Sequence, residues 1–187
     1  MPAPDKTGSA FCVKTSTLGR AYTGQMDITR ISLSDPTDRS SLQQLINQFA
    51  TSEAGGGEAI APGLLHDLPD QLAACPTYIG LLARVNGESV GLLNSFWSVS
   101  TFKARPLINI HDVTINPAFQ SRGIGAKMFA KLESIGREMN CCKLTLEVLD
   151  GNRRASALYE RLGFEFYQLD PAHGQARFMQ KLLLQAD

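Results

Sequence analysis

The segment Gln120–Ala126 contains the residue types that bind an anion. Gly123 and Gly125 stand in it after an apolar stretch that ends at Asn116-Pro117, and they open the clearest amphipathic helix pattern of the chain. The first N–H groups of a helix have no backbone partner, and the helix dipole favours negative charge there. Glycines also remove the Cβ atoms that would keep a ligand away from the backbone. With Arg122 beside it, this loop is predicted to hold phosphate groups.

The loop does not match the two common nucleotide-binding motifs. No third glycine stands at the spacing of the dinucleotide fingerprint, and no GK[ST] follows, as it would in a P-loop. The other glycine cluster, Gly55–Gly57, has no basic residue near it and is predicted to be a flexible loop. A nucleophilic hydrolase is poorly supported, because the chain has no G-x-S-x-G elbow.

Two motifs at fixed spacing identify a family. The first reads Gln120-Ser-Arg-Gly-Ile-Gly125, and the second runs from Asn152 to Tyr159, seven residues later, and on to Gly163-Phe164. With the Leu-Glu147-Val that precedes them, they resemble the GNAT superfamily of N-acetyltransferases, whose loop reads [QR]-x-x-G-x-[GA]. The resemblance covers about residues 26–184. Members of this family use acetyl-coenzyme A, which the resemblance therefore implies as co-substrate.

The resemblance also implies where the coenzyme binds. In the family, the strand before the loop and the strand after the helix splay apart, and the pantetheine arm lies in the gap. A backbone N–H on the splayed strand can stabilise the oxyanion that the thioester carbonyl becomes in the transition state. The implied coenzyme-binding residues are Val113, Thr114, Ile115, Gln120, Ser121, Arg122, Gly123, Ile124, Gly125, Ala126, Asn152 and Tyr159.

Tyr159 is the expected acid on the coenzyme side, where its hydroxyl protonates the departing thiolate. It also belongs to an apolar helical stripe with Leu158 and Leu162, so a tyrosine of the core is the alternative.

Glu147 is the first candidate for the base. An amine acceptor is mostly protonated at neutral pH and must lose a proton before it attacks. Glu147 alternates with two apolar neighbours, and we expect it to be half-buried, with a purely structural glutamate as the alternative. His111 is the second candidate, because imidazole accepts protons near neutral pH.

The acceptor side resembles a subgroup of the family. The segment Trp97–Val113 is similar to members that acetylate polyamines and other small amines, which have Glu-Asp where this chain has His111-Asp112. The acidic Asp112 suits a cationic amine, whereas His111 departs from the polyamine pattern. Strand alternation predicts that these two side chains face opposite sides of the sheet. Trp97 is the third candidate for the acceptor pocket, with core packing as its alternative.

Three functions remain open at this point. The first is transfer of an acetyl group to a small primary amine. The second is acetylation of a protein N-terminus or lysine, because the Leu-Glu147-Val, Asn152 and Tyr159 arrangement also resembles ribosomal-protein acetyltransferases. The third is a coenzyme A-binding or sensing module without turnover, and the intact Tyr159 and Glu147 favour an enzyme instead.

Hydrophobic periodicity predicts a mixed α/β domain over residues 26–187, after a tail or loosely packed arm over residues 1–25. The resemblance implies the GNAT fold, with a mixed sheet of about six to seven strands, a splay between central parallel strands, and about four flanking helices. Because the last strands of this family commonly pair across a dimer, we expect a homodimer. The predicted strands are 26–33, 78–85, 89–100, 107–115, 143–149, 164–169 and 176–184, and the predicted helices are 40–50, 62–74, 124–139 and 153–162.

Composition limits the partners. The chain has 187 residues and a formal net charge of zero, which disfavours a general attraction to nucleic acid or an anionic membrane. No apolar run reaches the ~18 residues that a membrane span needs, and the N-terminus has no secretory signal pattern. The four cysteines, Cys12, Cys75, Cys141 and Cys142, lack metal-ligand spacing. They are predicted to be reduced thiols in the cytoplasm, with no metal bound.

Overall fold

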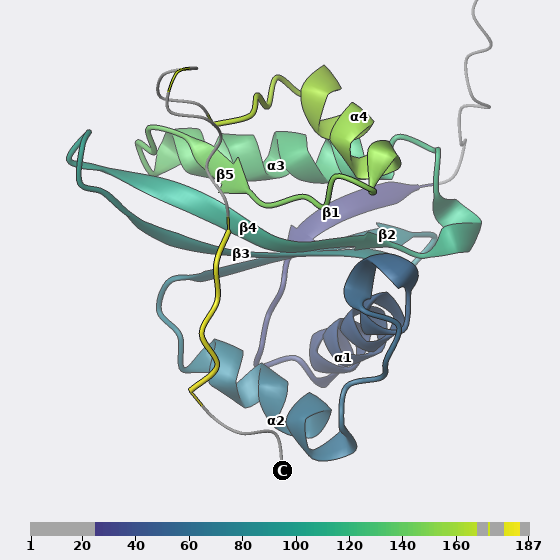
Figure 1. Ribbon diagram of the computed structural model, residues 1–187. Helices are drawn as coiled ribbons and strands as arrows, with labels where there is room; N and C mark the ends of the chain where they lie inside the picture. Colours follow the sequence, from purple (N-terminus) through teal and green to yellow (C-terminus); the bar gives the residue numbers. More distant parts are fainter. Residues whose placement is uncertain (1–24, 168–171, 173–177, 184–187) are drawn as a thin grey trace, which may run out of the picture.

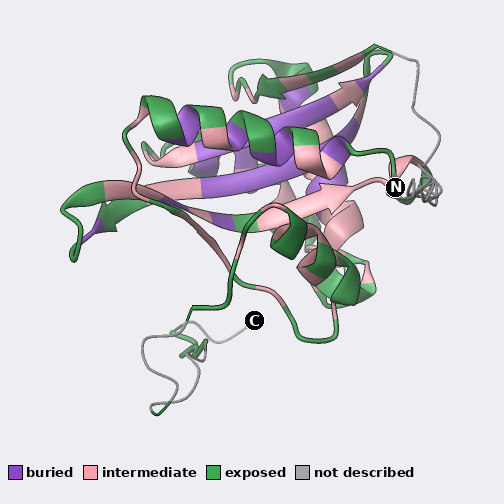
Figure 2. Ribbon diagram, turned by 90° about the horizontal axis from the view of Figure 1, so that it is seen from above, coloured by how far each residue is buried: buried purple, intermediate pink, exposed green. Residues whose placement is uncertain are grey.

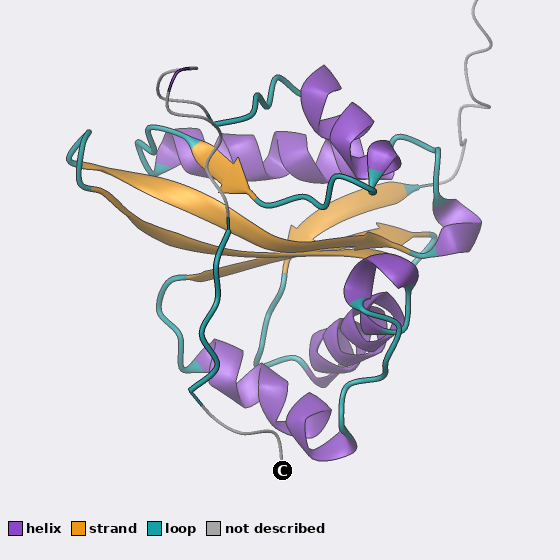
Figure 3. Ribbon diagram, viewed as in Figure 1, coloured by secondary structure: helices purple, strands orange, loops and turns teal. Residues whose placement is uncertain are grey.

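One five-stranded sheet organises the described part of the computed structural model, which comprises residues 25–167, 172 and 178–183. Its strands are β1 (Met26–Arg30), β2 (Tyr78–Val85), β3 (Glu88–Ser100), β4 (Arg105–Ile115) and β5 (Leu144–Leu146). They lie side by side in chain order, antiparallel except for the parallel pair of β4 and β5. A parallel pair needs a crossover, which α3 (Ile124–Glu138) supplies (Figure 3). This is the α/β architecture with a mixed sheet that the sequence predicts.

Two helical layers cover the two faces of the sheet (Figure 1). The helices α1 (Pro36–Ala50) and α2 (Pro62–Ala73) cover one side, here called the α1–α2 face. On the other side, the α3–α4 face, α3 packs beside α4 (Arg153–Arg161). Each layer encloses its own apolar cluster, so the central strands are buried on both faces (Figure 2). No helix in the described residues is long and apolar enough to cross a membrane.

The start of α1 follows from its capping residues. The Asp35 side chain accepts a hydrogen bond from the Thr37 N–H at 2.8 Å, and Pro36 occupies the first helical turn. Proline fits there because that N–H has no helical partner in any case. The helix therefore begins earlier than residue 40, the start that the apolar spacing predicts.

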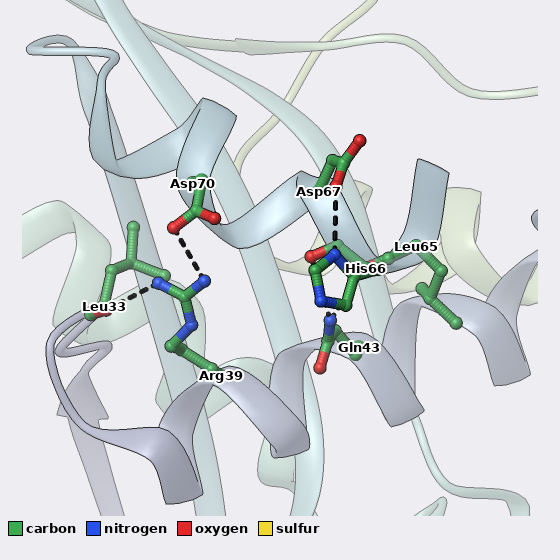
Figure 4. Close-up of polar contacts among 7 residues, drawn as sticks. All are labelled: Leu33, Arg39, Gln43, Leu65, His66, Asp67 and Asp70. Atoms are coloured by element: carbon green, nitrogen blue, oxygen red, sulfur yellow. Dashed lines mark hydrogen bonds and ion pairs between the residues drawn. The ribbon is translucent and has the colours of Figure 1, made fainter. Parts of the chain in front are cut away.

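Polar contacts fix α1 against α2 (Figure 4). The Arg39 guanidinium lies 2.7 Å from an Asp70 carboxylate oxygen and also donates to the Leu33 carbonyl at 3.2 Å. Further along α1, the Gln43 amide donates to the Leu65 carbonyl at 2.8 Å. These contacts hold the two helices together over the α1–α2 face.

The strands β4 and β5 pair over three residues only and then diverge. The last pair joins Ile110 to Leu146, whereas β4 continues to Ile115 with β3 as its neighbour. The other edge of β4, from His111 on, has no strand partner among the described residues. This divergence agrees with the predicted splay, and it shortens the predicted strand 143–149 to Leu144–Leu146.

A β-bulge interrupts β4 at His111. On β3, Asn94 pairs with Asp112 and Ser95 pairs with Ile110, so no residue of β3 is opposite His111. An extra residue in one strand reverses the alternation of every side chain that follows it.

The last two predicted strands are not strands in the structure. Within the described chain, residues 164–167 and 178–183 pair with no other strand, while 168–169, 176–177 and 184 lie outside the described residues. Most of their large apolar side chains are exposed, up to 88% for Met179, whereas Phe164 is half-buried against the core. An alternating pattern makes a strand only where a neighbour supplies hydrogen bonds, and β5 presents a very short edge. The count of six to seven strands is therefore wrong for the described chain, and the homodimer stays a prediction.

Candidate functional site

A cavity of about 1210 Å³ opens where β4 and β5 diverge. It exceeds the roughly 300–1,000 Å³ of ordinary small-molecule pockets, so it accommodates a long ligand. Its walls come from the end of α1, the free edge of β4, the glycine loop and α4. The predicted coenzyme-binding residues that line it are Val113, Thr114, Ile115, Gln120, Ser121, Gly123, Ile124, Gly125, Ala126, Asn152 and Tyr159.

The N-terminus of α3 opens into this cavity without a side-chain cap. Gly123 is its N-cap residue with a φ of 78°, and no side chain accepts a hydrogen bond from the first-turn N–H groups. A Cβ atom built on Gly123 would meet no other atom within 4 Å. Backbone donors at a helix N-terminus beside open space are the arrangement that binds phosphate groups.

Gly125 has a different structural role. A Cβ atom there would lie 3.1 Å from Cδ2 of Leu158, so this glycine lets α3 and α4 approach closely. Gly123 has the open space beside the backbone that the sequence predicts for both glycines, whereas a side chain at Gly125 would meet Leu158.

Arg122 does not line the cavity, although the sequence places it among the coenzyme-binding residues. Its guanidinium donates to the Ala118 carbonyl at 2.8 Å and lies 5.0 Å from the centre of the Phe119 ring. Those contacts hold its side chain against the turn that precedes the loop.

Arg154 places positive charge at the glycine loop, and sequence reasoning missed it. From the first turn of α4, its guanidinium donates to Gln120 Oε1 and, at 3.3 Å, to Ser121 Oγ. It lines the cavity. The available signal was its position two residues after Asn152, at the start of a helix that the second motif positions beside the loop.

Asn152 is the N-cap of α4. Its Oδ1 accepts a hydrogen bond from the Ala155 N–H at 3.1 Å, and the residue lines the cavity. The cap holds the Asn152 side chain through its oxygen, and the predicted role of this residue in coenzyme binding stays a prediction.

Tyr159 combines the two roles that the sequence left open. Its ring centre lies 5.5 Å from that of Phe129 and 5.9 Å from that of Phe164, within the α3–α4 core. It also lines the cavity, and no described residue forms a hydrogen bond with its hydroxyl. Burial raises the pKa of Tyr159 above its ordinary value of 10.0, so the hydroxyl stays protonated at neutral pH and able to donate.

Glu147 is exposed, so the expectation of a half-buried carboxylate is wrong. Its Oε1 lies 3.4 Å from the Asn109 amide nitrogen, which also donates to Thr145 Oγ1 at 3.0 Å. Asn109 is opposite Phe96, whose ring packs in the cluster under α1 and α2, so this group lies on the α1–α2 face. Glu147 is uncovered because β5 ends at Leu146, and it does not line the cavity.

His111 and Asp112 lie on the same face, so the prediction that they face opposite sides is wrong. The His111 ring packs edge-on against Phe96 with ring centres 4.8 Å apart. Asp112 Oδ2 accepts a hydrogen bond from Asn94 Nδ2 at 3.0 Å. Asn94 and Phe96 are two residues apart on β3 and therefore share the α1–α2 face. The bulge at His111 brings both side chains to this face.

Trp97 lies apart from that pair. It packs against the apolar cluster of the α3–α4 face and does not line the cavity. The alternative of core packing describes its surroundings, and His111 and Asp112 do not line the cavity either.

No three described His, Cys, Asp or Glu side chains are grouped so that they could hold a metal ion. Three of the cysteines, Cys75, Cys141 and Cys142, are free thiols, and Cys12 lies outside the described residues.

A family model and several known proteins match this chain. Residues 43–164 match the model of the acetyltransferase (GNAT) family. A thialysine N-epsilon-acetyltransferase from Bos taurus is 38% identical over 68 residues, which cover 36% of this chain and only 39% of that protein. The protein of the same name from Mus musculus is 27% identical over 147 residues, 74% of this chain and 85% of that protein.

Solved structures of low sequence identity share the fold. Aminoglycoside N-acetyltransferase AAC(6')-Iy in complex with CoA superposes with a TM-score of 0.64 at 16% identity, over 86% of this chain and 97% of that chain. An aminoglycoside acetyltransferase from an uncultured soil metagenomic sample has a TM-score of 0.67 at 18% identity, over 84% of this chain and 96% of that chain.

Proposed function

Because the chain belongs to the GNAT family of acetyltransferases, we propose that it transfers the acetyl group of acetyl-coenzyme A to a primary amine of a small molecule. The observation that carries the proposal is the uncapped N-terminus of α3 at a cavity of about 1210 Å³ that Tyr159 also lines. The first-turn N–H groups and Arg154 suit the diphosphate, and the free edge of β4 over Val113–Ile115 suits the pantetheine arm.

The reaction needs one proton acceptor and one proton donor. The amine nitrogen bonds to the acetyl carbon, the carbon–sulfur bond breaks, the amine gives up a proton, and the departing sulfur takes one. Tyr159 is the proposed donor, because its hydroxyl is protonated and has no partner among the described residues. Glu147 is the first proposed acceptor, acting through water because it is exposed, and His111 is the second.

The acceptor is proposed to be cationic. The carboxylates of Asp112 and Glu147 both lie on the α1–α2 face, beside the splay. Thr114, two residues after Asp112 on β4, lines the cavity, and two strand residues span about 7 Å. The names of the relatives, which refer to thialysine and to aminoglycosides, support an amine of this kind.

Release of free thiol from acetyl-coenzyme A tests the proposal. The purified chain is offered 1,5-diaminopentane, a lysine-containing peptide with a blocked N-terminus, and a peptide with a free N-terminus. We expect release with the diamine well above that with either peptide. Release with peptides alone would favour a protein acceptor, and coenzyme binding without any release would favour a sensing module.

Glu147→Gln is expected to lower kcat/KM about tenfold, mainly on the acidic side of the pH profile. A carboxylate still accepts protons at pH values where imidazole and water are poor acceptors, so its loss is felt most there. The measurement is kcat/KM between pH 5.5 and 9. His111→Ala is the parallel variant, and the base assignment moves to His111 if that variant alone changes the rate and the profile.

A further inference from the structure

We propose that Tyr78 and Asn94 are positioning residues that hold the Asp112 carboxylate as an anchor for the cationic group of the acceptor that is not acetylated. The inference rests on the proposed function, because it concerns the acceptor of the same reaction. It adds two residues of β2 and β3 that neither motif contains.

The three side chains form a chain of hydrogen bonds across three strands. The Tyr78 hydroxyl donates to Asn94 Oδ1 at 2.8 Å, and Asn94 Nδ2 donates to Asp112 Oδ2 at 3.0 Å. A carboxylate only accepts, so the NH2 group of Asn94 must face Asp112 and its carbonyl must face a donor. The Tyr78 hydroxyl is that donor, and it therefore fixes which end of the amide faces the carboxylate.

The chain of hydrogen bonds is built into the core of the α1–α2 face. Asn94 is only 4% exposed and shares that face with Leu92, a member of the apolar cluster there. Gly80 makes room for the hydroxyl, because a Cβ atom there would lie 2.1 Å from the Tyr78 oxygen. Burial and the charge of Asp112 raise the pKa of Tyr78, which keeps the hydroxyl a donor.

Apolar packing of the core does not require the hydrogen-bonded chain of Tyr78, Asn94 and Asp112. Buried amides and hydroxyls cost free energy unless each is paired, whereas a leucine at this position would simply extend the apolar cluster. What the pairing achieves is a carboxylate held in one orientation at the bulge of β4.

The held carboxylate has no cation of its own. No described Lys or Arg forms an ion pair with Asp112, and only its Oδ2 has a hydrogen-bond partner among the described residues. The residue is partly exposed, and two residues further along the same face Thr114 lines the cavity. An ammonium group of the acceptor supplies the missing charge when it binds to the second carboxylate oxygen.

A matched pair of acceptors measures the anchor. The probes are 1,5-diaminopentane and pentylamine, which have the same length and differ in the second amine. Asp112→Asn is expected to raise KM for the diamine about 30-fold, and Tyr78→Phe about fivefold, with kcat within about twofold and pentylamine unaffected. Tyr167→Phe, an exposed tyrosine with no contact to this group, is the control and should change neither KM.

The decisive comparison is the double variant Tyr78→Phe with Asp112→Asn. If the hydroxyl acts through the carboxylate, Tyr78→Phe raises the diamine KM no further once Asp112 is neutral. Equal effects of Tyr78→Phe in both backgrounds, or equal effects on both amines, would show a structural role only and overturn the inference. Asn94→Leu, with its fold checked by circular dichroism, is a second variant that should reproduce the diamine-specific loss.

Failure of the proposed function gives a different result. In that case the unmodified protein releases no thiol with either amine, and the inference falls with it. When both amines react at the same rate in every variant, the acetyltransferase activity stands and only the anchor is refuted.

Discussion

Tyr159→Phe is expected to lower kcat about 100-fold while leaving the Kd for acetyl-coenzyme A unchanged. The substitution removes only the hydroxyl, so the ring keeps its packing against Phe129 and Phe164. Without the hydroxyl, the sulfur must leave as a thiolate or take its proton from water. Single-turnover rates and coenzyme binding by calorimetry separate the two effects.

The pH dependence of that variant is specific. Because burial raises the pKa of Tyr159 above 10.0, the hydroxyl is protonated throughout the range from pH 6 to 9. The loss in kcat should therefore be the same across this range, and deprotonation of Tyr159 would lower the wild-type rate only above pH 10. Tyr159 also affects folding stability. Because its pKa is higher in the folded than in the unfolded state, its contribution to the free energy of unfolding falls only as the pH rises above 10. A reduction confined to one limb of the profile, or one of twofold or less, would show that Tyr159 is a core residue that does not donate to the sulfur.

Gly123→Asp is expected to weaken acetyl-coenzyme A binding about 100-fold. A carboxylate at the N-cap of α3 accepts hydrogen bonds from the first-turn N–H groups and repels the diphosphate, at a cost of roughly 3 kcal/mol for a like charge about 5 Å away. The φ of 78° suits aspartate and asparagine better than other side chains, and a Cβ atom there meets no other atom. The Tm should fall modestly, because a side chain at this positive φ is strained, and the favourable charge at the helix N-terminus offsets only part of that cost.

Gly123→Asn is the matched control for charge. It caps the helix with the same shape, so it should weaken binding by a smaller factor, about tenfold. Equal affinities of the two variants and the unmodified protein would show that the coenzyme does not use this helix terminus. Gly125 is unsuitable for the test, because a side chain there would press on Leu158 and disturb α4.

Local patterns in the sequence predicted most of the coenzyme side. The residues of the glycine loop and the Asn152–Tyr159 segment are close in the chain to the helices whose ends they form, and both motifs line one cavity in the structure. The helix from Ile124 followed from the same local information, because a helix start depends on neighbouring residues, whereas the splay beside it was expected from the family resemblance.

The charge at the loop depended on tertiary structure. Arg122 is next to the glycines in sequence, yet its side chain turns to the Ala118 carbonyl, while Arg154 reaches Ser121 from another helix. Adjacency in the chain does not determine where a side chain points. Arg154 of α4 therefore supplies the positive charge that the sequence analysis assigned to Arg122.

For His111 and Asp112, sequence and tertiary structure determined different properties. The sequence determined that a histidine and an aspartate stand together on a central strand and that an acidic group suits an amine. Which way they face depended on the bulge at His111, and the carboxylate's partners depended on Asn94 and Tyr78 from two other strands. A bulge is a property of the pairing between two strands, so alternation within one strand does not reveal it. The orientation of Asp112 and its hydrogen-bond partners therefore depend on how β2, β3 and β4 align in three dimensions.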